Sequence, residues 1–310
     1  MDLRQLRYFV AIVDAGSMAR AAERIFVAQT SLSEHIKALE RTLGTTLLER
    51  HPRGVRPTRA GRVLYEHANA ILKMQQVIVE EVKSCGDEVQ GTVSVGMPNT
   101  VSEILAAPLL EAVLTHLPGV RLCLVQGFSG TLERSLLDGK LDISLLFITA
   151  PQAAERLAVT HLLDEAMFVV MSNARASRRE AVRVAELEHE PLFCPHAEHG
   201  LTKVIMAYAR HHGATLRIGA EVDSLPAMIG AATRELGYAV LPGGVFHASE
   251  LPPDVALLPF DPPLDRPLSL CKPRLRPAGS AVLAVEATLL DVVGELVASG
   301  QWKGARPAPL

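Results

Sequence analysis

Residues 17–61 read SMARAAERIFVAQTSLSEHIKALERTLGTTLLERHPRGVRPTRAG, and this stretch decides the fold of the N-terminal part of the chain. Ser17 precedes a short apolar-periodic segment and is a residue type that caps helix N-termini. A second helix is predicted from Gln29, because leucine and isoleucine recur there at spacings of four, three and four, and Gly44 ends it. The turn between the helices falls on residues 26–28. This layout predicts a helix-turn-helix, whose second helix enters the DNA major groove.

The front of the predicted second helix carries polar side chains that face outward. Residues 47–57 predict a two-stranded wing behind it, with a turn at 52–54 and projecting arginines. Beside a helix-turn-helix, such arginines contact phosphate more often than they merely face solvent. We expect base or phosphate contacts from the helix and backbone contacts from the wing. The predicted DNA-contacting residues are Gln29, Thr30, Ser31, Ser33, Lys37, Arg50 and Arg53.

The first sixty residues closely resemble the DNA-binding domain of LysR-type transcriptional regulators. The resemblance rests on many matches at fixed spacing: Leu6, Phe9, Val13, Gly16, Ser17, Ala21, Ala22, Gln29, Ser31, Ser33, Ile36, Leu39, Glu40, Leu43, Gly44, Leu47, Arg50, Thr58, Ala60 and Gly61. Three positions depart from the commonest family pattern, namely Ala28, Thr30 and Leu48. The first two lie where the reading helix begins, so the resemblance does not fix the base preference.

The distribution of charge supports a DNA-binding head on an acidic body. The chain has 310 residues, which suggests two or three domains, and a net charge of −3, which alone argues against nucleic-acid binding. Residues 1–62, however, hold eleven lysine or arginine residues against six acidic ones, a net charge of +5, so the remainder carries −8. A basic patch confined to one module is the electrostatic footprint of a modular DNA binder.

Several other classes of protein are disfavoured. The N-terminus lacks the apolar run of a secretory signal, and no apolar stretch reaches the roughly 20 residues that a membrane helix needs. Four scattered cysteines, without a CxxC pair, fit reduced thiols in a cytoplasmic protein. No nucleophile elbow or phosphate loop is present, so we predict neither an enzyme nor a bound cofactor.

A long helix is predicted from Arg59 to Lys83, capped by Thr58 and carrying an apolar stripe. In the LysR family the corresponding helix joins the two halves of the chain and pairs with its copy in a second subunit. The alternative is an ordinary core helix of one domain. The resemblance implies a homodimer that assembles into a homotetramer.

The sequence pattern changes after the polar segment 84–91. Predicted strands and helices then alternate along the chain, which indicates a parallel sheet with crossover helices. The resemblance implies a C-terminal α/β effector domain with two lobes, like a periplasmic binding protein, behind an all-α winged helix-turn-helix and a linker helix. We predict a DNA-binding domain at 1–58, a linker and dimerisation segment at 59–90, and an effector domain at 91–310. Lobe I would span about 91–162 and 267–300, and lobe II about 163–266. The tail 306–309 is predicted to be disordered.

Four loops follow predicted strands of the α/β part, where open parallel sheets bind ligands. Helix N-termini at these loops attract carboxylates. A single loop of this kind is more often a plain capped turn, but four that converge on one cleft favour a binding site. The family's effectors bind in this cleft, often as small organic acids. The predicted ligand-binding residues are Pro98, Asn99, Thr100, Val101, Ser102, Phe128, Ser129, Phe147, Thr149, Cys194, His196 and Thr202.

Weaker hypotheses remain open beside this one. Cys194, His196 and His199 could hold a metal, and a related branch of the family uses a cysteine in this lobe for redox sensing, but neither a fourth ligand nor a resolving cysteine lies nearby. An effector-independent regulator with a vestigial cleft is a further alternative. A solute-binding protein would lack the basic head. The expected partners are double-stranded promoter DNA, a small-molecule effector and RNA polymerase, and no membrane.

Overall fold

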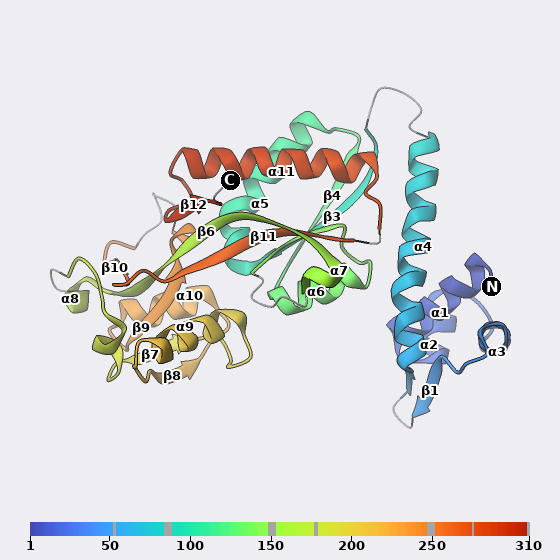
Figure 1. Cartoon of the computed structure of the whole chain (residues 1–310), viewed down its shortest axis with the longest axis horizontal. Coiled ribbons are helices and arrows are strands. Elements are labelled where there is room, and N and C mark those ends of the chain that lie inside the picture. Colours follow the sequence, from blue (N-terminus) through green and yellow to red (C-terminus); the bar gives the residue numbers. More distant parts are fainter. Residues whose placement is uncertain are drawn as a thin grey trace.

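The computed structural model describes residues 1–51, 54–83, 89–147, 153–176, 179–246, 252–274 and 276–308. Figure 1 shows a small helical head at one end, a long helix beside it and a larger α/β body. The head and long helix comprise α1 (Leu3–Ala15), α2 (Met18–Arg24), α3 (Gln29–Leu43), β1 (Leu48–His51), β2 (Gly54–Pro57) and α4 (Arg59–Lys83). The predicted helix-turn-helix, wing and long helix are therefore all present.

Local chemistry sets the ends of the head's elements. Gly44 adopts a left-handed φ of 66° and ends α3 as predicted. Thr58 caps α4, because its Oγ1 accepts a hydrogen bond of 3.0 Å from the Gly61 amide. Ser17 is the N-cap residue of α2 as predicted, but its side chain does not make the capping hydrogen bond expected of it.

The body is built on one long, twisted sheet with helices on its faces. Its elements are β3 (Gly91–Pro98), α5 (Asn99–His116), β4 (Val120–Gly127), α6 (Ser129–Leu137), β5 (Ile143–Leu146), α7 (Ala153–Arg156), β6 (Leu157–Ser172), α8 (Asn173–Ala176), η1 (Val184–Leu187), β7 (Pro191–Cys194), α9 (Gly200–His211), β8 (Arg217–Glu221), α10 (Leu225–Thr233), β9 (Tyr238–Pro242), η2 (Gly243–Val245), β10 (Val255–Pro259), β11 (Asp265–Pro273), α11 (Ser280–Ala298) and β12 (Ala305–Pro307).

The chain passes twice between two lobes, first along the long strand β6 and then through the segment that joins β10 to β11. The strand order is β4-β3-β5-β11-β6-β9-β7-β8, and β10 and β12 also pair with β6. We call the part around β3, β4 and β5 lobe I, and the part around β7, β8 and β9 lobe II. Residues 157–166 of β6 pair antiparallel with β11 in lobe I, whereas residues 167–172 pair with β9 and β10 in lobe II. The first crossing is therefore one continuous strand, β6, whereas the chain returns through residues 260–264, between β10 in lobe II and β11 in lobe I.

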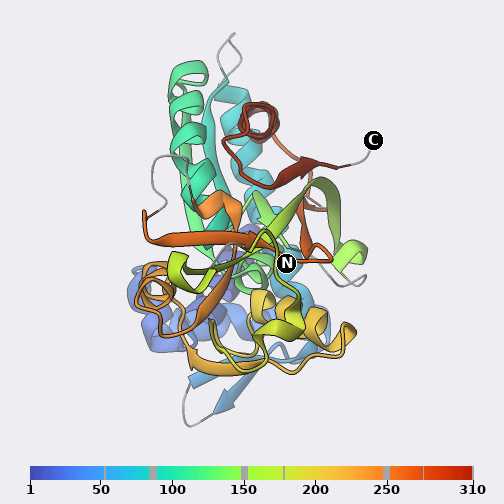
Figure 2. The ribbon, with the colours of Figure 1, turned by 90° about the vertical axis from the view of Figure 1, so that its left-hand side faces the viewer.

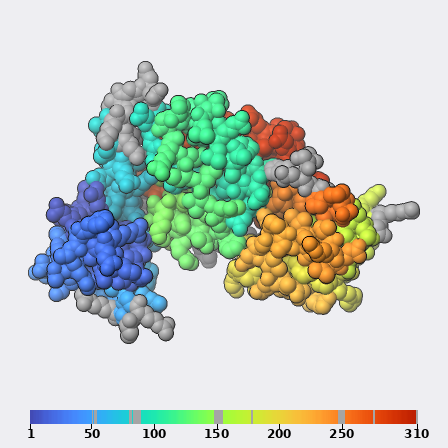
Figure 3. Space-filling model, turned by 180° about the vertical axis from the view of Figure 1, so that it is seen from behind, coloured from blue at the N-terminus to red at the C-terminus, as the bar shows by residue number. Residues whose placement is uncertain are grey.

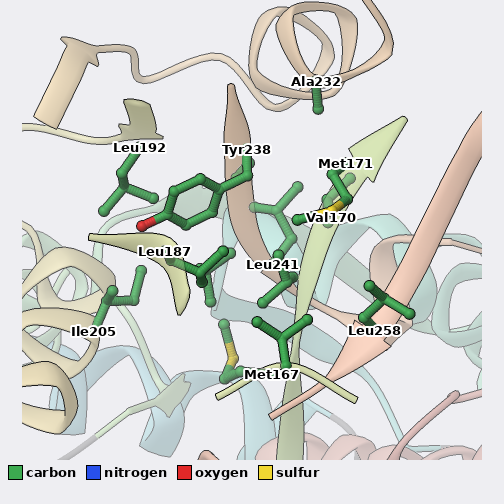
Figure 4. Packing of buried hydrophobic residues seen from close by; sticks show 14 of the residues in the cluster. Met167, Val170, Met171, Leu187, Leu192, Ile205, Ala232, Tyr238, Leu241 and Leu258 are labelled. Atoms are coloured by element: carbon green, nitrogen blue, oxygen red, sulfur yellow. The ribbon is translucent and has the colours of Figure 1, made fainter. Parts of the chain in front are cut away.

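Each lobe has its own aliphatic core. The lobe I core lies under α5 and α11, which lie side by side in Figures 1 and 2. In lobe II the ring of Tyr238 packs among Leu187 and Leu192 (Figure 4), and α9 and α10 flank this core. Two separate cores joined by two crossings of the chain match the predicted two-lobed α/β fold.

The C-terminal segment was mispredicted. Residues 306–308 were expected to be disordered, but Ala305–Pro307 forms β12, which pairs antiparallel with β6. The amide of Ala308 also donates to the carbonyl oxygen of Leu162. The segment therefore lies across the point where β6 passes between the lobes.

Candidate functional site

The head presents the predicted polar surface on α3. Gln29, Thr30 and Lys37 are exposed, and Ser31 and Ser33 are half-buried on the same helix. Of the predicted wing residues, Arg50 lies in β1, while Arg53 falls outside the described part of the chain. The arrangement leaves the front of α3 open to a groove of DNA.

Packing and one carboxylate fix α3 relative to the wing. Leu32, Ile36 and Leu39 are buried on its back face. Glu40 Oε1 accepts hydrogen bonds from the amides of Leu47 at 2.8 Å and Leu48 at 3.3 Å. Because Glu40 lies on α3 and Leu48 begins β1, these hydrogen bonds hold the helix and the wing together.

The second candidate site lies between the lobes, where Figure 3 shows a notch in the surface. Three elements of lobe I end there: β3 runs into α5 at Asn99, β4 runs into α6 at Ser129, and β5 ends before Phe147. Ser129 Oγ accepts a hydrogen bond of 3.3 Å from the Phe147 amide, so two of these ends are joined. Pro98 and Gly127 are partners at the ends of the parallel strands β3 and β4, so the N-termini of α5 and α6 lie at the same edge of the sheet.

A buried ion pair lies where β6 and β11 pair, next to Thr100 and Phe147. Arg266 on β11 donates from Nε and Nη2 to Glu165 Oε2 on β6, at 2.9 and 2.7 Å. The side chains are 5% and 0% exposed. Arg266 Nη2 also donates to Thr100 Oγ1 at 2.8 Å, and its guanidinium lies 3.6 Å from the centre of the Phe147 ring. Burial lowers the pKa of Arg266, and the Glu165 carboxylate opposes that shift.

The other carboxylate oxygen connects the C-terminal segment to the same network. Trp302 Nε1 donates to Glu165 Oε1 at 2.9 Å. Both oxygens of Glu165 are thereby satisfied, which a buried carboxylate requires. The network thus links β6, β11, α5 and the segment after α11 at the junction of the lobes.

Aromatic rings meet across the cleft. Phe128 of lobe I lies edge-on to His196 and His199 of lobe II, with ring centres 5.9 and 4.6 Å apart. His199 Nδ1 accepts a hydrogen bond of 3.1 Å from the Leu201 amide, which caps α9. Since Nδ1 is an acceptor, the proton of the neutral ring lies on Nε2.

The pKa of His199 is lowered from 6.5 to about 4, chiefly by burial and further by His196 and Arg266, with Asp223 acting in the opposite direction. The folded protein therefore binds fewer protons than the unfolded chain between these two values. The free energy of unfolding should fall as the pH falls from 6.5 towards 4.

The His199→Asn variant should weaken this pH dependence. Asparagine keeps an acceptor for the Leu201 amide but does not titrate. The test is the urea midpoint measured from pH 7 to pH 4.5, which should fall less steeply in His199→Asn than in the wild type. His211→Asn, at an exposed position at the end of the same helix, serves as control and should keep the wild-type slope.

The structure places the predicted ligand-binding residues in different surroundings. Thr100, Ser129 and Phe147 lie in the lobe I network, and Phe128 faces His196 across the cleft. Asn99 and Ser102 are half-buried in the first turn of α5, and Thr149 falls outside the described residues. The remaining four residues are buried and present no accessible polar group to a ligand: Pro98, Val101, Cys194 and Thr202.

The metal and redox hypotheses gain no support from this geometry. Within the described ranges, no group of three or more histidine, cysteine or acidic side chains is placed to hold a metal ion. Cys194 is 1% exposed, and burial raises the pKa of its thiol. A reactive cysteine needs an accessible thiolate, and both properties oppose one here.

Four site residues were not predicted from the sequence as effector-cleft residues: Glu165, His199, Arg266 and Trp302. Glu165 and Arg266 each follow another charged residue, Asp164 and Asp265, so the sequence does not single them out as charges within an apolar strand. Their pairing could not be found locally, because they lie 101 residues apart in the chain.

Two models of known protein families match most of the chain. A family model described as a bacterial regulatory helix-turn-helix protein of the lysR family matches residues 3–62. A second model, the LysR substrate binding domain, matches residues 86–294. The two matches cover the head and both lobes. Separately, none of the helices among the described residues has the length and apolar character that a membrane crossing needs.

Similar proteins are transcriptional regulators rather than enzymes. The nitrogen assimilation regulatory protein nac of Klebsiella aerogenes is 34% identical over 244 residues, 78% of each chain. The hydrogen peroxide-inducible genes activator of Dickeya chrysanthemi is 28% identical over 272 residues, 87% of this chain and 88% of its own. The structure of full-length OxyR from Pseudomonas aeruginosa superposes with a TM-score of 0.75 at 23% identity, over 99% of this chain and 97% of that one.

Proposed function

The chain belongs to the LysR family of transcriptional regulators, and from that premise we propose how its head reads DNA and how its cleft controls the reading. The observation that carries the proposal is the joining of a basic winged helix-turn-helix to two lobes whose helix N-termini meet at one cleft. The division into residues 1–58, 59–90 and 91–310 is part of the proposal.

In the head, α3 enters the major groove and the wing follows the backbone. Gln29, Ser31 and Ser33 reach base edges or nearby phosphates, and Lys37 adds a positive charge on the same helix. Arg50 and Arg53 hold the phosphate backbone. The local charge of +5 supports this assignment, because phosphate neutralisation supplies most of the non-specific affinity for DNA.

The long helix α4 pairs with the same helix of a second copy. Its first part packs on the head through Leu64 and Tyr65, but an apolar stripe farther along stays uncovered. Ile71 and Ile78 are seven residues apart and Val82 follows four later, with exposed fractions of 41%, 52% and 66%. Apolar side chains at these spacings form a helix-pair seam. A homodimer that assembles into a homotetramer would place several heads on one promoter.

The cleft binds a small-molecule effector that shifts the lobes between two arrangements. The lobe I helix ends, Thr100 and the rings of Phe128 and His196 would contact it, and a small organic acid suits the partial positive charge of those ends. The bound molecule changes DNA bending, and contact with RNA polymerase, only if its affinity differs between the two arrangements. The competing possibility is a regulator whose cleft binds nothing.

A thermal-shift screen of metabolites on the full chain separates these possibilities. A ligand that binds only the folded state must raise the unfolding temperature. The Thr100→Val variant keeps the shape of the side chain but removes the hydroxyl, so it should reduce the shift. A screen without any responding compound would favour the vestigial cleft.

Replacing Lys37 by glutamine should weaken binding to all DNA sequences alike and lower the salt slope of log K by about one. Replacing Gln29 by alanine should instead change sequence preference at one position, because a base contact is lost. Binding is measured by fluorescence anisotropy on DNA selected by the wild type. Lys203→Gln, which removes a lysine from lobe II, is the matched control. Wild-type binding in both head variants would refute the assignment.

A further inference from the structure

The turn between α6 and β5, residues 138–142, lies directly against the long helix α4. Gly139 has a φ of +76°, and a Cβ at this position would lie 3.0 Å from Asn69 Cβ on α4. The next contact is charged: Lys73 Nζ on α4 lies 3.1 Å from Asp142 Oδ2, with side chains 18% and 4% exposed. Lobe I and the helix that carries the head are therefore in close contact within one chain.

Asp142 is held firmly from the lobe I side. Its Oδ2 accepts a hydrogen bond of 2.9 Å from the Ser94 amide on β3, and its own amide donates to the Ser94 carbonyl oxygen at 2.8 Å. Arg276, after β11, lies 3.7 Å from the other carboxylate oxygen. Because Asp142 is fixed to β3, its ion pair with Lys73 transmits the position of lobe I to α4.

Weaker charge pairs around the Lys73–Asp142 pair extend the contact between lobe I and α4 to the head. Lys140 lies 3.3 Å from Asp14 on α1, and Asp14 also accepts a hydrogen bond from the Tyr65 hydroxyl. Arg156 on α7 pairs with Glu66 on α4 at 2.6 Å. These pairs are exposed and contribute little individually, so the Lys73–Asp142 pair is the best-shielded charged contact of the interface.

We use the name α6–β5 hairpin for the unit formed by α6, the turn 138–142 and β5. Its end opposite the turn lies in the cleft. α6 begins at Ser129, directly after Phe128, and β5 ends one residue before Phe147, which stacks on Arg266. α6 has nine residues and is thus about 13 Å long. β5 is buried along its whole length. A packed hairpin of this length moves as a rigid piece rather than deforming.

We propose that the α6–β5 hairpin couples the cleft to the DNA-binding head, with the Lys73–Asp142 ion pair as its docking point on α4. The proposal rests on the proposed function, because it assigns how that cleft acts on DNA. A shift of Phe128 and Phe147 at the cleft end displaces the turn 138–142 at the other end. The angle between head and lobe I then changes, and with it the DNA shape that an assembled regulator imposes.

Lys73→Met tests this directly in the full-length protein. Methionine keeps an apolar stem on α4 but removes the charge, while Asp142 retains the Ser94 amide and Arg276. Lys203→Met is the matched control, since Lys203 pairs at 2.6 Å with Glu198 in lobe II, away from α4. Amide hydrogen exchange in residues 136–146 should become at least about fivefold faster in Lys73→Met and stay unchanged in the control.

The functional arm uses a DNA fragment selected from random sequence by the wild type and labelled at both ends. Lys73→Met should bind it with an affinity within about threefold of the wild type but bend it less, because a released head lets the DNA relax towards its straight form. Unchanged exchange, or faster exchange with an unchanged bend, would overturn the proposal. If selection with the wild-type chain enriches no DNA sequence, the proposed function itself is contradicted, and the coupling with it.

Discussion

Replacing Glu165 by leucine should lower the free energy of unfolding by about 3–5 kcal/mol, because it leaves the buried guanidinium of Arg266 without its counter-charge. Arg266 is only 4% exposed, so water cannot replace the lost carboxylate. The indole N–H of Trp302 loses its acceptor as well. Trp302 is the single tryptophan of the chain, so urea unfolding followed by its fluorescence reports on this network.

Two further variants separate the buried charge from general damage. The double variant Glu165→Leu with Arg266→Leu should be more stable than Glu165→Leu alone, since no unpaired charge remains. Arg306→Ala breaks a neighbouring pair with Asp265 in which Arg306 is 57% exposed, and it should cost no more than about 1 kcal/mol. A double variant no more stable than the single one would show that the ion pair is not the source of the loss.

Gly61→Ala should reduce DNA affinity at least about a hundredfold by unfolding or displacing part of the head. A Cβ at Gly61 would lie 2.1 Å from the carbonyl oxygen of Leu47 and 3.1 Å from Pro57 Cβ. That carbonyl accepts a hydrogen bond of 2.9 Å from the Thr58 amide. The backbone therefore has to separate α4 from the wing, and a domain of this size has little stability to spare.

The matched control is another helical glycine with free space around it. Gly294 lies inside α11 and has nothing within 4 Å of an added Cβ, so Gly294→Ala should stabilise the chain by about 0.5–1 kcal/mol. Its DNA affinity should not change. Circular dichroism melting and anisotropy titration measure the two effects. A Gly61→Ala protein with wild-type affinity would show that the close approach to Leu47 is not needed for binding.

Prediction from sequence worked best where structure is encoded within a few residues. The apolar spacing of α3 and the glycine at its end are such signals, and both its start at Gln29 and its end at Leu43 were recovered. The buried back face holds Leu32, Ile36 and Leu39 as predicted, although Leu43 is 39% exposed at the helix end. A repeat of 3.6 residues leaves the same pattern wherever a helix has one buried face.

Strands that depend on distant partners were the ones missed. The segment 157–166 forms the first ten of the 16 residues of β6, yet it mixes apolar residues with His161, Asp164 and Glu165 and shows no clean alternation. It becomes a strand because β11 pairs with it more than a hundred residues later in the chain. The strand β12 was missed for the same reason, since its partner is also β6.

Sequence by itself determined the helix-turn-helix and the family, because these follow from local periodicity and fixed motif spacing, and the resemblance to that family implied the two-lobed α/β class. It also placed the lobe I loop residues at the carboxyl ends of strands. Only the tertiary structure decided which charges meet: Glu165 with Arg266, and Trp302 with a residue 137 positions away. It likewise brought Lys73 to Asp142 across 69 residues. Burial creates such pairings, because a charge that leaves water needs a partner, whatever their separation in the chain.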